Sequence, residues 1–248
     1  MYVGVDEAGK GPVLGPMVTA AVRADPAALP ADVDDSKRVS SDRREAIAAT
    51  LRDREDVSVA VATIEPADID RPETDMNTLT VAGQASAIRD VVEPGDRVIA
   101  DAADTSEERF AERLVDRLNG VADAPNATVE DAPNANDVAD APNANDVADA
   151  PSATVAVEAR HGADAEVSVV GAASIVAKTT RDTLMAEIDA AHPAYDGVGS
   201  GYPSDPTTRT FLAEYVADHG ELPDCARRSW STCTDVLASV EQSGLDEF

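Results

Sequence analysis

The sequence predicts an α/β protein built around a mixed β-sheet. Strand-like segments come first as a cluster, at residues 2–6, 16–23 and 57–64, where apolar residues alternate or form short runs. Later in the chain, short apolar runs alternate with segments of helical periodicity. Clustered strands followed by alternating strands and helices are typical of an α/β domain whose sheet combines parallel and antiparallel pairs.

Two helices are expected in the first half of the chain. One lies near residues 41–54, where Asp42 and Glu45 have the spacing of a capping box. The other is longer and lies near residues 77–92.

The second half of the chain supplies two more strands and the remaining helices. A short buried strand at 97–101 ends in a carboxylate. A helix near 106–118 follows, and Thr105 and Glu108 have the spacing of a capping box at its start. A strand returns near 153–158 and leads to a long helix near 170–190. A C-terminal helical segment is expected at 206–248. The prediction is therefore a five-stranded sheet flanked by helices within a single domain at 1–248.

The composition fits one cytoplasmic domain. Apolar residues make up 43% of the 248 residues, but aromatic residues only 3%, so the core must be built from Val, Ala, Leu and Ile. No apolar run approaches the roughly 18 residues that span a membrane. The N-terminus lacks the pattern of a signal peptide. We expect a cytoplasmic monomer without a membrane partner.

The charge is strongly acidic, with 48 acidic and 20 basic residues and a net charge of −28. Lysine is rare, and the three lysines are Lys10, Lys37 and Lys178. Low lysine with abundant Asp, Glu, Ala and Val suggests adaptation to molar salt. Because the Debye length falls to about 3 Å at 1 M salt, distant surface acids would barely affect a phosphate-bearing ligand. The charge therefore neither supports nor excludes a nucleic-acid substrate.

Residues 122–153 differ from the rest of the chain. The unit DAPNANDVA occurs at 131–139 and again at 140–148. The unit has almost nothing large and apolar to bury, so it does not favour a repeat fold. We expect an acidic, low-complexity insert that is disordered.

The segment GVDEAGKG at 4–11 allows two interpretations. Gly4, Gly9 and Lys10 have the spacing of a phosphate-binding P-loop. However, Gly11 stands where such a loop carries Ser or Thr, and two carboxylates would lie inside a loop that binds phosphate through bare N–H groups. A P-loop nucleotide hydrolase is therefore kept only as an alternative.

The second interpretation starts from carboxylates at the ends of strands. Asp6 and Glu7 end the first strand, Asp101 ends the fourth, and Asp164 precedes the long helix. Carboxylate oxygens suit Mg²⁺ or Mn²⁺. Carboxylates that converge from separate segments are the basis of two-metal phosphodiester hydrolysis. The alternative is that each acid is a solvated surface group and that the chain is a non-catalytic acidic binding module.

Six motifs in order resemble those of the ribonuclease HII family, in its archaeal form. They cover nearly the whole chain except the insert. The motifs are GVDEAGKGPVLGPMV at 4–18, DSK at 35–37, ADAADTSEERF at 100–110, GADAEVSVVGAASIVAKTTRD at 162–182, SGYPSDPTT at 200–208 and RRSW at 227–230.

The resemblance implies a ribonuclease H-like fold and a metal-dependent endoribonuclease. It implies cleavage of the RNA strand of RNA–DNA hybrids and at ribonucleotides within duplex DNA, leaving 5′-phosphate and 3′-hydroxyl ends. The implied catalytic and metal-binding set is Asp6, Glu7, Asp101 and Asp164, with Mn²⁺ or Mg²⁺ as the cofactor.

The resemblance also implies how the substrate is recognised. The segment Gly9-Lys10-Gly11 would meet the ribose 2′-hydroxyl through its backbone, and Tyr202 would pack on the sugar. Lys37 and Lys178 are expected to contact phosphates. This sequence departs from the family pattern at Lys10, where the family usually has Arg.

Overall fold

The computed structural model describes residues 1–31, 33, 40–120, 130–131 and 155–245. Lys37 lies outside the described residues. So does the predicted insert at 122–153, except for two residues that pair with the sheet.

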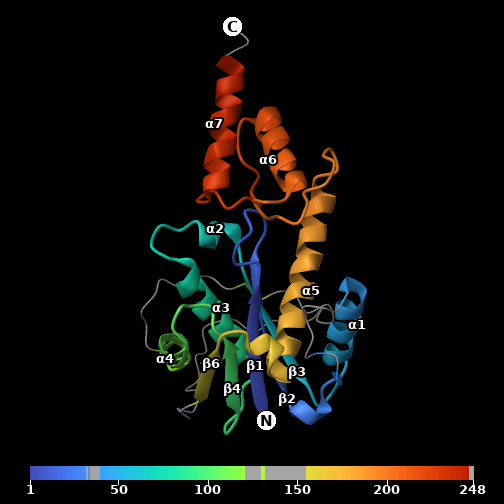
Figure 1. The fold of residues 1–248 in the computed structure, drawn as a ribbon, viewed down its shortest axis with the longest axis vertical. Helices are drawn as coiled ribbons and strands as arrows, with labels where there is room; N and C mark the ends of the chain where they lie inside the picture. Colours follow the sequence, from blue (N-terminus) through green and yellow to red (C-terminus); the bar gives the residue numbers. More distant parts are fainter. Residues whose placement is uncertain (32, 34–39, 121–129, 132–154, 246–248) are drawn as a thin grey trace, which may run out of the picture.

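A mixed β-sheet forms the centre of the molecule (Figure 1). The strand order is β5-β3-β2-β1-β4-β6, in which β1 pairs with β4 and β4 with β6 in parallel, while the other pairs are antiparallel. The five predicted strands are present, and β5 is a further two-residue strand at the edge. The bounds are β1 Tyr2–Ala8, β2 Met17–Ala24, β3 Ser58–Ile64, β4 Arg97–Asp101, β5 Glu130–Asp131 and β6 Ala156–Arg160.

Helices cover both faces of the sheet (Figure 1). On one face, α5 packs on β1 and β2, and α1 packs on α5 and β3, through apolar residues. On the other face, α3 and α4 enclose a second apolar cluster. These elements are α1 Ser41–Arg52, α3 Met76–Arg89, α4 Glu107–Leu118 and α5 Ser168–Ala191, with short helices η1 Pro26–Ala28, α2 Pro66–Ile69 and η3 Ala163–Ala165 between them.

The contact between β1 and α5 is a backbone contact at Gly4. A Cβ atom on Gly4 would lie 2.2 Å from the carbonyl carbon of Val169, so only glycine fits there. Side chains alternate along a strand. Asp6 therefore shares the α5 face with Gly4, whereas Val5 belongs to the apolar cluster of the α3 face.

The C-terminal helices α6 (Pro206–His219) and α7 (Ser231–Leu245) lie at the far end of the molecule from the N-terminus (Figure 1). They pack around Phe211 and Leu212 against the β1–β2 loop, whose Val13 and Leu14 are fully buried. An isolated bridge joins Leu14 to Ala226. Among the described residues, no helix is long and apolar enough to cross a membrane.

Two predicted capping boxes are wrong, by one or two residues. The N-cap of α1 is Ser40, whose side chain accepts the N–H of Arg43 at 3.4 Å. The N-cap of α4 is Ser106, whose side chain accepts the N–H of Arg109 at 3.2 Å. Several polar residues precede each helix, and in both cases the serine adjacent to the first helical residue takes the cap.

Candidate active site

The carboxylates of Asp6, Glu7 and Asp101 lie at the carboxyl ends of the parallel strands β1 and β4. Val5 of β1 pairs with Ala100 of β4, so the next residues along, Asp6 and Asp101, lie at the same level of the sheet. The Asp101 carboxylate accepts the N–H of Ala163 in η3 at 2.8 Å. This bond ties the segment that carries Asp164 to the end of β4.

Asp6 and Asp164 are buried on the α5 side and share polar partners from that helix. Ser174 of α5 hydrogen-bonds to the Asp6 side chain. The Lys178 Nζ donates to Ser174 Oγ at 2.5 Å and lies 3.9 Å from an Asp164 oxygen. Lys178 therefore stands between the two acids and offsets part of their charge.

Glu7 has a different set of partners because strand alternation turns it towards α3. Its Oε2 accepts a hydrogen bond from Gln84 Nε2 at 2.9 Å. The same nitrogen also donates to the carbonyl of Asp101 at 3.3 Å. Gln84 thus links the ends of β1 and β4 from the face opposite to α5.

The protein offsets only part of the negative charge at this edge. Burial and the neighbouring Glu7 raise the pKa of Asp6 well above its usual range. Burial, with a contribution from Asp101, raises the pKa of Glu7 to about 7, although Gln84 and Lys10 oppose the rise. Crowded carboxylates with raised pKa values favour proton or cation binding.

The chemistry of these donors fits a hard divalent cation, which prefers oxygen ligands. In the part of the chain that the structure describes, no three His, Cys, Asp or Glu side chains already enclose an ion-sized space. The fit therefore rests on the oxygen donor set and on the part of its repulsion that the neighbouring side chains do not offset. A cation bound between Asp6, Glu7 and Asp101 would remove that repulsion.

A cavity of about 380 Å³ adjoins this edge. It brings together most of the residues expected to bind substrate, and Glu7 forms part of its wall. Its lining comprises Glu7, Ala8, Gly9, Lys10, Gly11, Arg44, Lys178, Arg181, Asp182 and Tyr202. The Tyr202 ring is 43% exposed, and the Arg181 guanidinium lies 5.7 Å from the centre of that ring. An exposed aromatic ring beside cationic groups suits stacking on a nucleotide.

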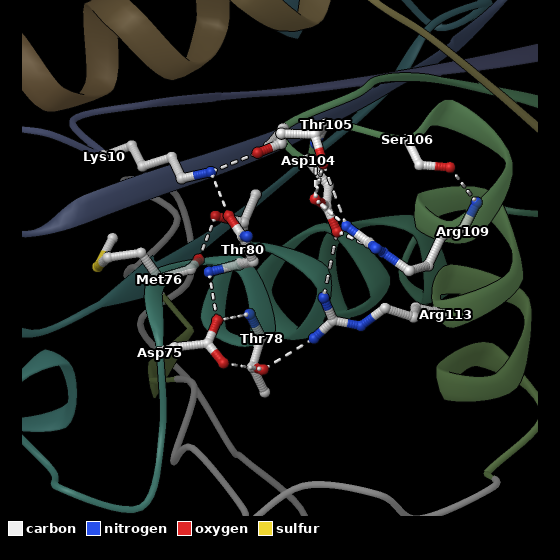
Figure 2. A network of polar contacts seen from close by, with 12 residues as sticks. Lys10, Asp75, Met76, Thr78, Thr80, Asp104, Thr105, Ser106, Arg109 and Arg113 are labelled. Carbon is white, nitrogen blue, oxygen red and sulfur yellow. Dashed lines mark hydrogen bonds and ion pairs between the residues drawn. The ribbon is translucent and has the colours of Figure 1, made fainter.

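Lys10 is anchored to the protein on the α3 side (Figure 2). Its ammonium donates to Asn77 Oδ1 at 2.8 Å and to the carbonyl of Ala103 at 2.6 Å. Its charge also lowers the pKa of Glu7. Lys10 thus connects the glycine loop, Gly9-Lys10-Gly11, with α3 and with the segment that follows β4.

Asp104 lies in the same network of polar contacts as Lys10, to which it is linked through Arg113 and Thr78 (Figure 2). It pairs with Arg109 at 2.6 Å and with Arg113 at 3.8 Å, and the hydrogen bond from Arg109 lowers its pKa to about 2. Asp104 is therefore neutralised by arginines of α4 and does not belong with the crowded carboxylates.

The alternative of a P-loop is wrong. Such a loop leads from a strand into a helix whose N-terminus faces the phosphates. Here the chain after Lys10 enters β2, which runs antiparallel to β1. Asp6 and Glu7 also lie within β1 rather than in a loop.

Several polar residues at this site were not singled out from the sequence. Gln84 lies inside a helical segment that shows only its apolar periodicity. Ser174, Arg181 and Arg227 lie within the motifs that resemble the family, and this membership was the only sequence feature that could have pointed to them. Arg227 is fully buried and donates to carbonyls of the glycine loop. One of these carbonyls belongs to Lys10, which lies 217 residues earlier in the sequence.

Comparison with known proteins agrees with this architecture. The family model described as ribonuclease HII matches residues 3–130 and 124–233. A ribonuclease HII of Haloarcula marismortui is 52% identical over 100% of both chains. The crystal structure of ribonuclease H2 from Pyrococcus horikoshii OT3 has a TM-score of 0.74 and 30% identity, and the match covers 97% of this chain and 99% of that one.

A second solved structure shows the same similarity. It is the PCNA:RNase HII complex from Archaeoglobus fulgidus, with a TM-score of 0.71, 30% identity and 100% coverage of both chains. The chain therefore belongs to the ribonuclease HII family, the metal-dependent endoribonucleases that act on RNA–DNA hybrids.

Proposed function

We propose that this chain hydrolyses the phosphodiester bond on the 5′ side of a ribonucleotide, in RNA–DNA hybrids and at single ribonucleotides within duplex DNA. Water adds to phosphorus, the bond from phosphorus to the upstream 3′ oxygen breaks, and that oxygen takes a proton. The products are a 5′-phosphate and a 3′-hydroxyl. The observation that carries the proposal is the group of crowded carboxylates beside a cavity lined by the glycine loop.

The proposed metal ligands are Asp6, Glu7, Asp101 and Asp164, which would hold Mn²⁺ or Mg²⁺. Two such ions would supply an activated water and would stabilise the leaving oxygen. The protein's own contribution is positional. Ser174 orients Asp6, and Gln84 orients Glu7, so both carboxylates are held before substrate arrives.

The proposed substrate contacts lie around the cavity. The backbone of Gly9, Lys10 and Gly11 would meet the ribose 2′-hydroxyl, which is the group that distinguishes RNA from DNA. Tyr202 would pack on the sugar, and Lys178 would contact a phosphate while remaining close to Asp164. Lys37 keeps its proposed phosphate contact on sequence grounds.

A DNA duplex that holds one ribonucleotide tests the proposal. The wild-type protein is incubated with this duplex and Mn²⁺ or Mg²⁺ at low and at molar salt, beside Asp101→Asn. We expect one cut, 5′ to the ribonucleotide, that Asp101→Asn does not make. An all-DNA duplex is the control and should stay intact.

Two results would contradict the proposal. The absence of cleavage under all combinations of salt and metal would contradict the proposed activity. Full activity in Asp101→Asn would remove the carboxylate mechanism and would favour the acidic binding module. Better cleavage at low than at molar salt would contradict only the inferred adaptation to salt.

We further propose that the chain acts as a monomer and binds the PCNA of its own organism. The support for the contact with PCNA is the full-length similarity to the ribonuclease HII solved in complex with PCNA. The monomer stays an expectation from the sequence. Size-exclusion chromatography at molar salt, with and without that PCNA, tests both statements. Co-elution at the mass of one chain per PCNA subunit or fewer is expected, whereas a dimer of this chain alone would contradict the first statement.

A further inference from the structure

The buried guanidinium of Arg227 makes three hydrogen bonds, all with main-chain carbonyls of the β1–β2 segment. Nη2 donates to Gly9 at 2.6 Å, Nη1 to Lys10 at 3.1 Å, and Nε to Gly15 at 2.9 Å. Arg227 is 0% exposed. A buried charge is costly unless it is well hydrogen-bonded, so an arginine at this place implies that the geometry it imposes matters.

The neighbouring Trp230 extends the same contact by one residue. Its indole Nε1 donates to the carbonyl of Gly11 at 3.2 Å, and its ring lies 5.2 Å from the Arg227 guanidinium carbon. The carbonyls of three consecutive residues, Gly9, Lys10 and Gly11, are therefore all bound by the segment at 227–230.

This pattern fixes the direction of the loop's N–H groups. A trans peptide group holds its C=O and the following N–H on opposite sides. No described peptide bond is cis. Because the carbonyls of Gly9 and Lys10 point to Arg227, the N–H groups of Lys10 and Gly11 point away from it. Both N–H groups belong to residues that line the cavity.

The Arg227–Trp230 pair is itself held in place. Asp70 accepts the backbone N–H groups of Arg228 and Ser229 at 2.7 and 2.9 Å, and the N–H of Arg227 donates to the Val13 carbonyl at 2.8 Å. On the other side, Gly9 has a φ of 86° and packs against Arg181. The loop is thus enclosed between the C-terminal segment and α5.

We propose that Arg227 and Trp230 are positioning residues for sugar recognition. By binding the carbonyls of the glycine loop, they hold the N–H groups of Lys10 and Gly11 in a fixed orientation towards the 2′ oxygen of the substrate. This inference rests on the proposed function, because it assigns a role in the choice between ribose and deoxyribose. Neither residue contacts the reacting phosphate in this assignment.

Arg227→Met tests the proposal, with Arg228→Met as the matched control. Both remove one positive charge, but the Arg228 side chain is half exposed and makes an ion pair with Asp224 on the surface. The readout is the dissociation constant for a duplex with one ribonucleotide relative to the all-DNA duplex, measured by fluorescence anisotropy with EDTA at molar salt. The same variants are also assayed for KM and kcat with Mn²⁺.

We expect the wild type and Arg228→Met to prefer the ribonucleotide duplex over the all-DNA duplex by the same factor. In Arg227→Met this preference should be about tenfold smaller, which corresponds to about 1.4 kcal/mol. KM for the ribonucleotide substrate should rise by a similar factor. If Arg227 had only a structural role, Arg227→Met would lower the melting temperature and would weaken the binding of both duplexes equally. Such an equal loss, or an unchanged ratio, would overturn the proposal.

Trp230→Phe is the second variant in case Arg227→Met does not fold. It keeps a ring beside Arg227 but cannot donate to Gly11, so the ratio should fall about threefold, and an unchanged ratio would overturn the proposal. Trp230 is the single tryptophan of the chain, so its emission should change when wild-type protein binds the ribonucleotide duplex. If the wild type binds the two duplexes equally, this inference fails, whereas the proposed function fails only if the cleavage test with Mn²⁺ or Mg²⁺ fails.

Discussion

Two neighbouring regions of the site, the carboxylate edge and the glycine loop, differ in how their charges and dipoles are balanced. At the carboxylate edge, strands bring Asp6, Glu7 and Asp101 together and leave their repulsion largely unrelieved. At the glycine loop, the chain supplies its own cation, and Arg227 binds the backbone carbonyls directly. In the proposed mechanism the first region needs a bound cation to offset its charge, whereas the second is held by the chain's own Arg227. Variants in the two regions should therefore fail in different ways.

The largest effect is expected from Asp6→Asn at the carboxylate edge. Cleavage should fall by about 10³-fold or more, because a proposed metal ligand is lost. The metal-free protein should be as stable as the wild type or more stable, because the charged form of Asp6 is disfavoured in the folded state. Cleavage rates and melting temperatures with EDTA check both statements. Asp56→Asn, an exposed acid paired with Arg54, is the control and should change neither.

Gly9→Ala should damage the loop through both stability and activity. A Cβ there would lie 2.3 Å from Arg181 Nε and 2.8 Å from the Pro16 carbonyl, at a φ of 86°. We expect a loss of about 2 kcal/mol or more of unfolding free energy and about 100-fold of activity. Gly11→Ala is the control for stability, because its Cβ would come no closer than 3.9 Å to Tyr202. Equal melting temperatures for the two variants would refute the tight enclosure of Gly9.

Lys10→Met tests the side chain that connects the two regions. It removes the bonds to Asn77 and Ala103 and the charge that lowers the pKa of Glu7. Activity should fall about tenfold, and the pH at which activity reaches half its maximum should move upwards. Lys10→Arg, which keeps the charge, should stay within about threefold of the wild type. A fall in activity without any movement of the pH profile would mean that Lys10 acts only through substrate binding.

The smallest effect is expected in the pH dependence of stability without metal. The pKa of Glu7 is raised from 4.5 to about 7 in the folded protein, so ionisation costs folding energy. The melting temperature with EDTA should therefore fall by several degrees as the pH rises from about 4.5 to about 7, and Mg²⁺ should restore more of it at pH 8 than at pH 5. Glu7→Gln should flatten this slope, and an equal slope in the variant would assign the effect to other groups.

The sequence predicted the strands well, because their periodicity is a local property. The five strands and the main helices lie within a few residues of their predicted bounds, and the carboxylates fall at the predicted strand ends. The caps at Ser40 and Ser106 were missed because several adjacent polar residues satisfy the same spacing rule. Gln84 and Arg227 were missed because their partners lie far away in the sequence. The roles of all the predicted site residues stay predictions until they are tested.

Gly4 sets the distance between β1 and α5 beside the site, although it carries no reactive group. The main chain of α5 rests directly on β1 at this residue, two positions before Asp6, and the same helix carries Ser174 and Lys178. The spacing between the first carboxylate and its partners is therefore fixed by an absent side chain. Even a single methyl group at residue 4 would push helix and strand apart and would misalign the site without altering any of its chemistry.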